Sequence, residues 1–252
     1  MPKSKKIVAI GGGEIGRPGY EIETTEIDLE IIRLTRKKQP KLLFFPTASG
    51  DSDGYITAVR TYFGDQLHCK VSALKLIGTK LTAAEIRKII LAQDIIYVGG
   101  GNTEKMIKIW KKLSVDAALR EALERGIVLS GLSAGSICWF RHGNSDSRRS
   151  RNPEAAMIKL RALNFIPALH APHYDVEAAR KPELAKMMKR TAGVAIAMDN
   201  CTALEVINDK YRIISSRATA NAYKVYWKRG KFHEEIIEKS PNFRSLSKLL
   251  KK

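Results

Sequence analysis

The chain has 252 residues, of which 44% are hydrophobic and 28% are charged, and its formal net charge is +18 at pH 7. This length allows a substantial buried core, and the composition is ordinary for a globular protein. The apolar run after the basic start is too short for a signal peptide, and no stretch reaches the 18 or more apolar residues of a membrane-spanning helix. We therefore expect a cytoplasmic protein with no membrane partner.

The basic residues do not form a recognition motif. Lys and Arg are spread along the sequence and mixed with Asp and Glu, and the densest groups lie at the two ends and in RHGNSDSRRSR (141–151). A basic protein is attracted to nucleic acid and other anions, but no basic segment here is interleaved with aromatic residues. We expect a solvated basic surface and no nucleic-acid partner.

The three cysteines, Cys69, Cys138 and Cys201, are far apart in the sequence, and no CxxC pair occurs. This pattern predicts neither a disulfide framework nor a zinc site.

Short apolar runs alternate with segments of helical periodicity along the chain. Strands are expected at 6–10, 41–45, 70–76, 94–98, 127–130, 203–207 and 211–215, and a hairpin over 222–232 turns at Arg229–Gly230. Helices are expected at 24–38, 52–63, 82–91, 115–125 and 176–191, directly after GGGNT (99–103), and from about Ala134. Thr25 with Asp28, and Thr82 with Glu85, resemble capping boxes.

Strands that are apolar throughout and alternate with helices indicate a parallel sheet covered by helices on both faces. We predict an α/β fold in a single domain over residues 1–252, with a basic tail from about residue 240.

Three glycine-rich turns follow predicted strands, at 11–16, 99–103 and 131–135. Because ligands bind at the carboxyl ends of parallel strands, these turns should line one edge of the sheet. Gly11, Gly13 and Gly16 match the dinucleotide fingerprint GxGxxG, but Pro18 and Gly19 interrupt the helix that should follow. We interpret this turn as shaping a pocket, or simply as a tight turn that requires glycine.

The third turn, GLSAG, fits the nucleophile elbow GxSxG, with Ser133 at its centre. The serine of such an elbow occupies a sharp strand-to-helix turn, where side chains at Gly131 or Gly135 would collide with the adjoining strand and helix. The N–H of Ala134 would then lie at a helix start and could donate to an oxyanion. The alternative is an ordinary N-cap serine.

A nucleophilic serine needs a base and a group that orients the base. His173, in ALHAPHYD, lies in a proline-bounded turn, where a side chain can be fixed at a pocket edge. His170 and His173 also have HxxH spacing, but no third metal ligand is evident, so we predict no metal. The orienting carboxylate could be Asp146, Asp175 or Glu177.

The combination of GGGNT, GLSAGSICWF, SDS and PHYD resembles the peptidase E family, which includes aspartyl dipeptidases and is related to cyanophycinases. The resemblance extends from the first glycine-rich turn to about residue 215. It implies a fold similar to class I glutamine amidotransferases: a flavodoxin-like three-layer sandwich with a mostly parallel central sheet. It also implies hydrolysis of peptides with an N-terminal aspartate, without metal or cofactor.

Position by position, the resemblance assigns Ser133 as the nucleophile and His173 as the general base, with Asp146 as the acidic partner. The oxyanion hole it implies is formed by the N–H group of Gly100 or Gly101 together with that of Ala134.

The resemblance places Asn102, beside Thr103, near the substrate aspartate. For the arginine that would hold the substrate carboxylate, our candidate is Arg180, with Arg141 and Lys181 as alternatives. These residues complete the predicted substrate-binding set.

The sequence thus predicts a cytoplasmic serine exopeptidase that acts on small peptides, with a homodimer as a further expectation. A cyanophycinase-like hydrolase of β-linked Asp–Arg peptides and a non-catalytic binding protein are the alternatives. A glutamine amidotransferase would need a cysteine at position 133; Cys138 is nearby, but the elbow residue is a serine.

Overall fold

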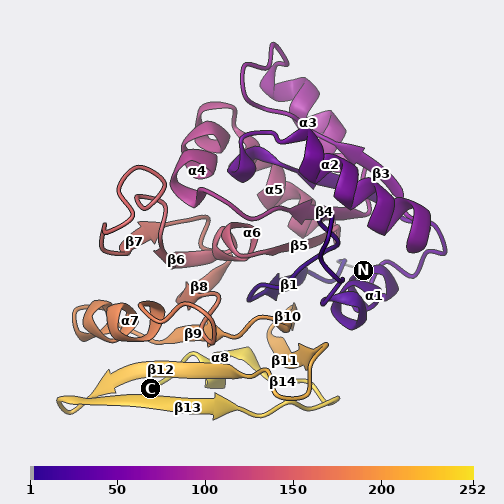
Figure 1. The fold of residues 1–252 in the computed structure, drawn as a ribbon. Coiled ribbons are helices and arrows are strands. Elements are labelled where there is room, and N and C mark those ends of the chain that lie inside the picture. Colours follow the sequence, from indigo (N-terminus) through magenta and orange to yellow (C-terminus); the bar gives the residue numbers. More distant parts are fainter. Residues whose placement is uncertain (1–2) are drawn as a thin grey trace.

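The computed structural model describes residues 3–252 and contains two β-sheets flanked by helices (Figure 1). The first sheet contains β1 (Lys6–Ile10), β2 (Lys41–Phe45), β3 (Lys70–Ala73), β4 (Ile95–Val98), β5 (Val128–Leu132), β10 (Thr202–Ile207), β11 (Lys210–Ser215) and β14 (Arg244–Ser245). Its strand order is β14–β11–β10–β1–β5–β4–β2–β3. The five strands from β1 to β3 in this order pair in parallel, and β10, β11 and β14 continue the sheet in antiparallel fashion.

The second sheet contains β6 (Phe140–Ser145), β7 (Ile158–Arg161), β8 (Ile166–Ala171), β9 (Ala195–Met198), β12 (Ala222–Lys228) and β13 (Lys231–Ile237), in the order β13–β12–β9–β8–β6–β7. Only β6 with β8 and β8 with β9 pair in parallel among its described strands. The fold is therefore mixed α/β with two sheets, where the sequence analysis predicted one mostly parallel sheet. The predicted hairpin is confirmed as β12 and β13.

The helices are α1 (Thr25–Arg33), α2 (Asp53–Val59), α3 (Ala83–Leu91), α4 (Thr103–Lys112), α5 (Val115–Glu124), α6 (Ala134–Ile137), α7 (Arg180–Lys189) and α8 (Leu246–Leu249), with a 3₁₀ turn at Thr47–Ser49 and a π-helical turn at Arg60–Gln66. One apolar cluster packs α3, α4 and α5 on one face of the first sheet, and a second packs α1 and α2 on the other. The predicted covering of the parallel strands by helices on both faces is confirmed.

The N-termini of three helices can be compared with the predicted capping residues and boundaries. The Thr82–Glu85 capping box is present in full. The Thr25–Asp28 box is wrong, because the N-cap is Thr24 and its hydroxyl donates to the Asp28 carboxylate instead of capping the backbone. Helix α7 begins four residues later than predicted, so that Pro182, which lacks an N–H, lies in its first turn.

The basic segment from about residue 240 contains packed structure. Strand β14 pairs with β11, and α8 places Leu249, 5% exposed, in the main apolar cluster. Across residues 3–252, none of the helices has the length and apolarity needed to cross a membrane.

Candidate active site

A cavity of about 990 Å³ opens at the carboxyl ends of β1, β4 and β5. The three glycine-rich turns all line it, through Gly13, Gly100 and Ser133. Helix α2 contributes Tyr55, and the turn after β8 contributes His173. The prediction that these turns share one edge of the sheet is confirmed.

Ser133 joins β5 to α6 with φ 56° and ψ −115°, a backbone conformation that costs free energy in a residue with a side chain. A Cβ on Gly131 would lie 2.4 Å from the Val98 carbonyl oxygen, and a Cβ on Gly135 would lie 2.0 Å from it. The turn therefore packs against β4 too closely for side chains, as the steric argument predicted. Ser133 is the N-cap residue of α6 by position, but its hydroxyl caps no helix N–H in the described chain, so side-chain capping does not explain the choice of serine here.

The second glycine-rich turn lies against the serine. A Cβ on Gly100 would lie 3.4 Å from the Ser133 Cβ and 3.8 Å from its Oγ. Gly101 has φ 131°, and its Cβ would lie 2.3 Å from the carbonyl oxygen of Ala48. Gly101 therefore requires a residue without a side chain, and Gly100 lies in contact with Ser133.

The first glycine-rich turn positions the histidine. The His173 N–H donates to the Gly11 carbonyl oxygen at 3.0 Å, and Nδ1 of its ring lies 2.7 Å from Oδ1 of Asn200. A Cβ on Gly12 would lie 2.2 Å from that Oδ1 and 2.4 Å from Nδ1. Since Oδ1 can only accept, Nδ1 carries the hydrogen and Nε2 is left with a lone pair. This is the tautomer that a general base requires.

None of the three predicted carboxylates hydrogen-bonds to the His173 ring. Asp146 lies in the loop after β6, and Glu177 pairs with a buried arginine of α7. Asp175 accepts from the backbone N–H of Asn200 at 2.9 Å and thereby fixes the loop that carries the amide. The sequence analysis missed Asn200 because it searched for acidic residues. The available signal was a polar residue just past the end of β9.

A second serine–histidine pair lies beneath the elbow. Ser136 Oγ lies 2.9 Å from Nε2 of His170, and His170 Nδ1 lies 2.8 Å from the Ile196 carbonyl oxygen. Ser136 Oγ is also 2.8 Å from the Ser133 carbonyl oxygen, which already accepts the N–H groups of Ser136 and Ile137. The single hydroxyl hydrogen therefore serves the imidazole, whose Nε2 is otherwise without a donor.

The predicted substrate arginine, Arg180, is only 1% exposed and lies outside the cavity lining. It donates to the carbonyl and side-chain oxygens of Asn144 and pairs with Glu177, so it joins α7 to β6. Arg141 bonds Asn164 and Lys181 pairs with a glutamate of β13. These cations stabilise the second sheet, and the assignment of Arg180 to substrate binding is not supported.

Asn102 is the N-cap of α4, where its side chain accepts from the N–H of Lys105 and donates to Ser147 and Ser150. Thr103 is 1% exposed. Neither residue lines the cavity; both lie at the start of α4, directly after the second glycine-rich turn.

Among the described lining residues, the Lys or Arg side chain present is Arg17, which the sequence analysis did not single out. Its side chain is 63% exposed, pairs with Glu14 at 2.6 Å and lies over the ring of Tyr20. The signal was present in the first turn itself, which continues into GRPG after Ile15.

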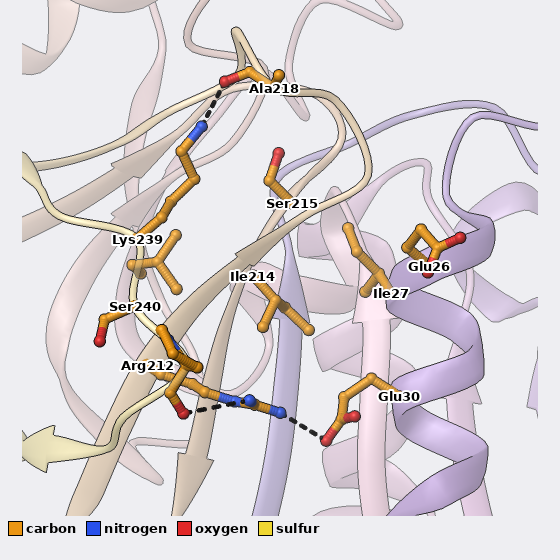
Figure 2. A pocket seen from close by; sticks show the side chains of 11 residues that line it. Glu26, Ile27, Glu30, Arg212, Ile214, Ser215, Ala218, Lys239 and Ser240 are labelled. Atoms are coloured by element: carbon orange, nitrogen blue, oxygen red, sulfur yellow. Dashed lines mark hydrogen bonds and ion pairs between the residues drawn. The ribbon is translucent and has the colours of Figure 1, made fainter.

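A second cleft, of about 560 Å³, lies between α1 and β11 (Figure 2). Arg212 donates to Glu30 at 2.8 Å and to the buried Glu205 at 2.6 Å, and the Lys239 ammonium donates to the Ala218 carbonyl oxygen. Arg212 and Glu30 thus pair across this cleft, Lys239 is bound to the backbone, and the described lining contains neither histidine nor cysteine. The first cavity is therefore the candidate active site.

The cysteines do not compete with Ser133 as nucleophiles. All three are buried, and burial raises the pKa of the Cys138 thiol well above its usual range. No cluster of three or more His, Cys, Asp or Glu side chains suited to a metal is found in residues 3–252.

A mixed α/β fold that presents a serine on a strained strand-to-helix turn, in the same open cavity as a histidine, is typical of hydrolytic enzymes with a nucleophile elbow. Comparison with known sequences places this chain more closely. It belongs to peptidase family S51, whose model matches residues 7–214. The chain is therefore a peptidase.

Curated relatives agree with this assignment. The chain is 37% identical to an uncharacterized peptidase, YgaJ, of Bacillus subtilis, over 88% of this chain and 92% of that protein. It is 28% identical to peptidase E of Shewanella denitrificans, over 75% of this chain and 80% of that protein.

Two solved structures share the fold. A peptidase from an acI-B1 Actinobacterium superposes with a TM-score of 0.70 at 19% identity, covering 97% of each chain. A putative peptidase E protein from Listeria monocytogenes has a TM-score of 0.61 at 19% identity, covering 84% of this chain and 98% of that one.

Proposed function

We propose that the protein is a serine exopeptidase of the dipeptidase E type, which hydrolyses short peptides with an N-terminal aspartate. The observation that carries the proposal is that Ser133, on its strained turn, and His173, with Nδ1 held by Asn200, line the same cavity. The amidotransferase-like three-layer arrangement, the single domain, the homodimer and the cytoplasmic location stay predictions.

The proposed mechanism uses the groups that line the cavity, and the tautomer of His173 supports it. Nε2 of His173 takes the proton of Ser133 as Oγ attacks the scissile carbonyl, and the same nitrogen later returns the proton to the leaving amine. The Asn200 amide fixes the ring and its tautomer but carries no charge. The Ala134 N–H, at the start of α6, is free of intrahelical partners and can stabilise the oxyanion.

Specificity for an acidic substrate rests on Arg17 in this proposal, in place of Arg180. Arg17 lines the cavity from the first turn, and its guanidinium is exposed enough to leave Glu14 and form a bidentate pair with a substrate carboxylate. The cavity, at about 990 Å³, has room for a short peptide.

The test is a dipeptide panel that varies only the first residue, from aspartate through glutamate and asparagine to alanine, with a β-linked Asp–Arg dipeptide included. We expect Asp-X cleavage to have the highest kcat/KM and Ser133→Ala to remove it. A fluorophosphonate probe should label Ser133 in the wild-type protein and leave Ser133→Ala unlabelled.

Two outcomes would contradict the proposal in different ways. Preferred cleavage of the β-linked peptide would replace the dipeptidase assignment with a cyanophycinase-like one that uses the same site. A wild-type protein that neither cleaves the panel nor reacts with the probe would be a binding protein on this fold.

A further inference from the structure

The hydroxyl of Tyr55 reaches the second glycine-rich turn, next to the proposed nucleophile. The N–H of Gly100 donates to the Tyr55 Oη at 3.3 Å, and both residues line the cavity together with Ser133. A Cβ on Gly100 would lie 3.8 Å from Ser133 Oγ, so Gly100 lies close to both the phenol and the serine.

The ring of Tyr55 is held in place from two sides. It packs edge-to-face on Phe44, with 5.0 Å between the ring centroids. A Cβ on Gly99 would lie 2.8 Å from the Tyr55 Cε1 and 3.0 Å from the Phe44 ring. Because Gly99 has no side chain, the Tyr55 ring can pack against this turn.

The hydrogen-bond inventory leaves the phenol hydrogen available. Tyr55 Oη accepts from Gly100, and within residues 3–252 no acceptor for its own hydrogen is found. Burial raises the pKa of Tyr55 to about 12, so the group remains a protonated donor at neutral pH. Because Oη accepts the Gly100 N–H, the O–H is polarised and becomes a stronger donor.

We propose that Tyr55 is a catalytic residue whose hydroxyl donates a hydrogen bond to the oxyanion of the tetrahedral intermediate. The Gly100 N–H is directed at Tyr55 and acts through it, while the Ala134 N–H serves the oxyanion directly. This inference rests on the proposed function, since it assigns the group that stabilises the oxyanion in the same site.

A bond forms between Ser133 Oγ and the substrate carbonyl carbon, the carbonyl π pair moves to oxygen, and the serine proton goes to Nε2 of His173. Tyr55 keeps its proton throughout and shares it with the new oxyanion as a hydrogen bond. Collapse of the intermediate restores the carbonyl and expels the amine, which takes the proton from His173.

The experiment compares Tyr55→Phe with Tyr97→Phe on the best dipeptide of the panel. Tyr55→Phe keeps the ring that packs on Phe44 and removes only the hydroxyl. Loss of one oxyanion donor lowers kcat by about 10²-fold or more, and KM should stay within about threefold because the donor acts on the transition state. Tyr97 is the matched control: it is fully buried and its hydroxyl has no partner in the described chain, so its removal should leave kcat unchanged.

A second readout separates this role from a structural one. A peptide boronate, which forms a tetrahedral adduct on the serine, should bind wild type more tightly than Tyr55→Phe by about the factor lost in kcat. The hydrolysis product should bind both equally. If Tyr55→Phe is unstable, tetrafluorotyrosine at position 55 keeps the hydroxyl and lowers its pKa, so kcat should fall as pH rises through that value.

The outcomes are distinguishable. An active wild type whose Tyr55→Phe variant keeps kcat within threefold overturns the role of Tyr55 and leaves the peptidase proposal intact. A wild type that neither cleaves dipeptides nor labels at Ser133 overturns both. A loss of kcat at constant KM, matched by the boronate, supports both.

Discussion

Two combinations of a serine and a histidine lie near the elbow, and their surroundings differ: Ser136 and His170 hydrogen-bond to each other, whereas Ser133 and His173 line the same cavity. Ser136 and His170 are fully buried, and both ring nitrogens of His170 have protein partners. Ser133 and His173 line an open cavity, and only Nδ1 of His173 has a protein partner in the described chain. Reactivity therefore depends on a free Nε2 and on access to substrate, which proximity of a serine and a histidine does not by itself provide.

The buried pair also supports the open one. Ser136 belongs to α6, which begins directly after Ser133, and His170 belongs to β8 of the second sheet. Their hydrogen bond ties the elbow to that sheet. Burial lowers the pKa of His170 to about 3, so the pair stays neutral and cannot serve as a base in the usual pH range.

The largest expected effect separates the two serines. Ser133→Ala should lower kcat by about 10⁴-fold or more, because the nucleophile is lost, and should leave the melting temperature nearly unchanged. Ser136→Ala should keep kcat within about tenfold and lower the free energy of unfolding by about 1–3 kcal/mol, since His170 Nε2 loses its donor inside the protein. Dipeptide kinetics and thermal unfolding measured on both variants check this. Comparable activity losses would mean that the comparison of the two pairs is wrong.

The next largest effect tests which residue orients the His173 ring. Asn200→Ala should lower kcat by about 10²-fold, because the His173 ring loses the acceptor that sets its tautomer and orientation. Asn200→Asp should restore part of the rate and shift the acidic limb of the kcat/KM profile to higher pH, since a carboxylate favours the protonated imidazole.

The control for this prediction is Asp146→Asn. Asp146 lies in the loop after β6, and its substitution should leave both the rate and the profile unchanged. A loss of activity in Asp146→Asn together with a silent Asn200→Ala would restore the original assignment from the sequence.

A third effect follows from the pKa of the buried histidine. Unfolded histidine titrates near pH 6.5, whereas folded His170 titrates near 3. Between these values the unfolded state binds the additional proton, so the contribution of His170 to stability is present above pH 6.5 and is lost as pH falls toward 3. This amounts to about 2 kcal/mol between pH 7 and pH 5.

The measurement is the unfolding free energy of wild type minus that of His170→Gln, which should grow by about 2 kcal/mol from pH 5 to pH 7. Asp28 acts in the opposite sense: burial raises its folded pKa to about 7, so its contribution is present at low pH and is lost as pH rises. The wild-type curve should therefore be nearly flat in this window, and Asp28→Asn should make it rise with pH. A flat difference between wild type and His170→Gln would mean that the buried pair is hydrated or charged.

The sequence predicted the half of the site that local geometry determines. The elbow around Ser133 and the three glycine-rich turns are each encoded in a few consecutive residues, because a strand followed by a turn without side chains has few alternatives. The same applies to the apolar strands of the parallel half and to the Thr82 capping box.

The other half depends on contacts between distant segments. Asn200 is 27 residues from His173, and the two meet because the turn at Gly11–Gly13 packs against both. The second sheet was not anticipated, because pairing directions depend on topology rather than on residue pattern. Arginine is usually a surface residue, so the sequence does not reveal that Arg180 is buried. Only its bonds to Asn144 and Glu177 in the structure show that it is structural.

The smallest expected effect tests which substrates the cavity containing Ser133 and His173 prefers. Arg17→Gln should raise KM for Asp-X dipeptides about tenfold, which corresponds to about 1.4 kcal/mol, and should leave Ala-X cleavage unchanged. The reason is that Arg17 is the arginine lining the cavity, and a charge-assisted bond to an exposed guanidinium contributes modestly. Arg141→Gln and Lys181→Gln, outside the lining, are matched controls that should change neither substrate. Equal losses for Asp-X and Ala-X in Arg17→Gln would show that Arg17 shapes the turn through Glu14, and would move recognition of the acidic group to backbone donors of the glycine-rich turns.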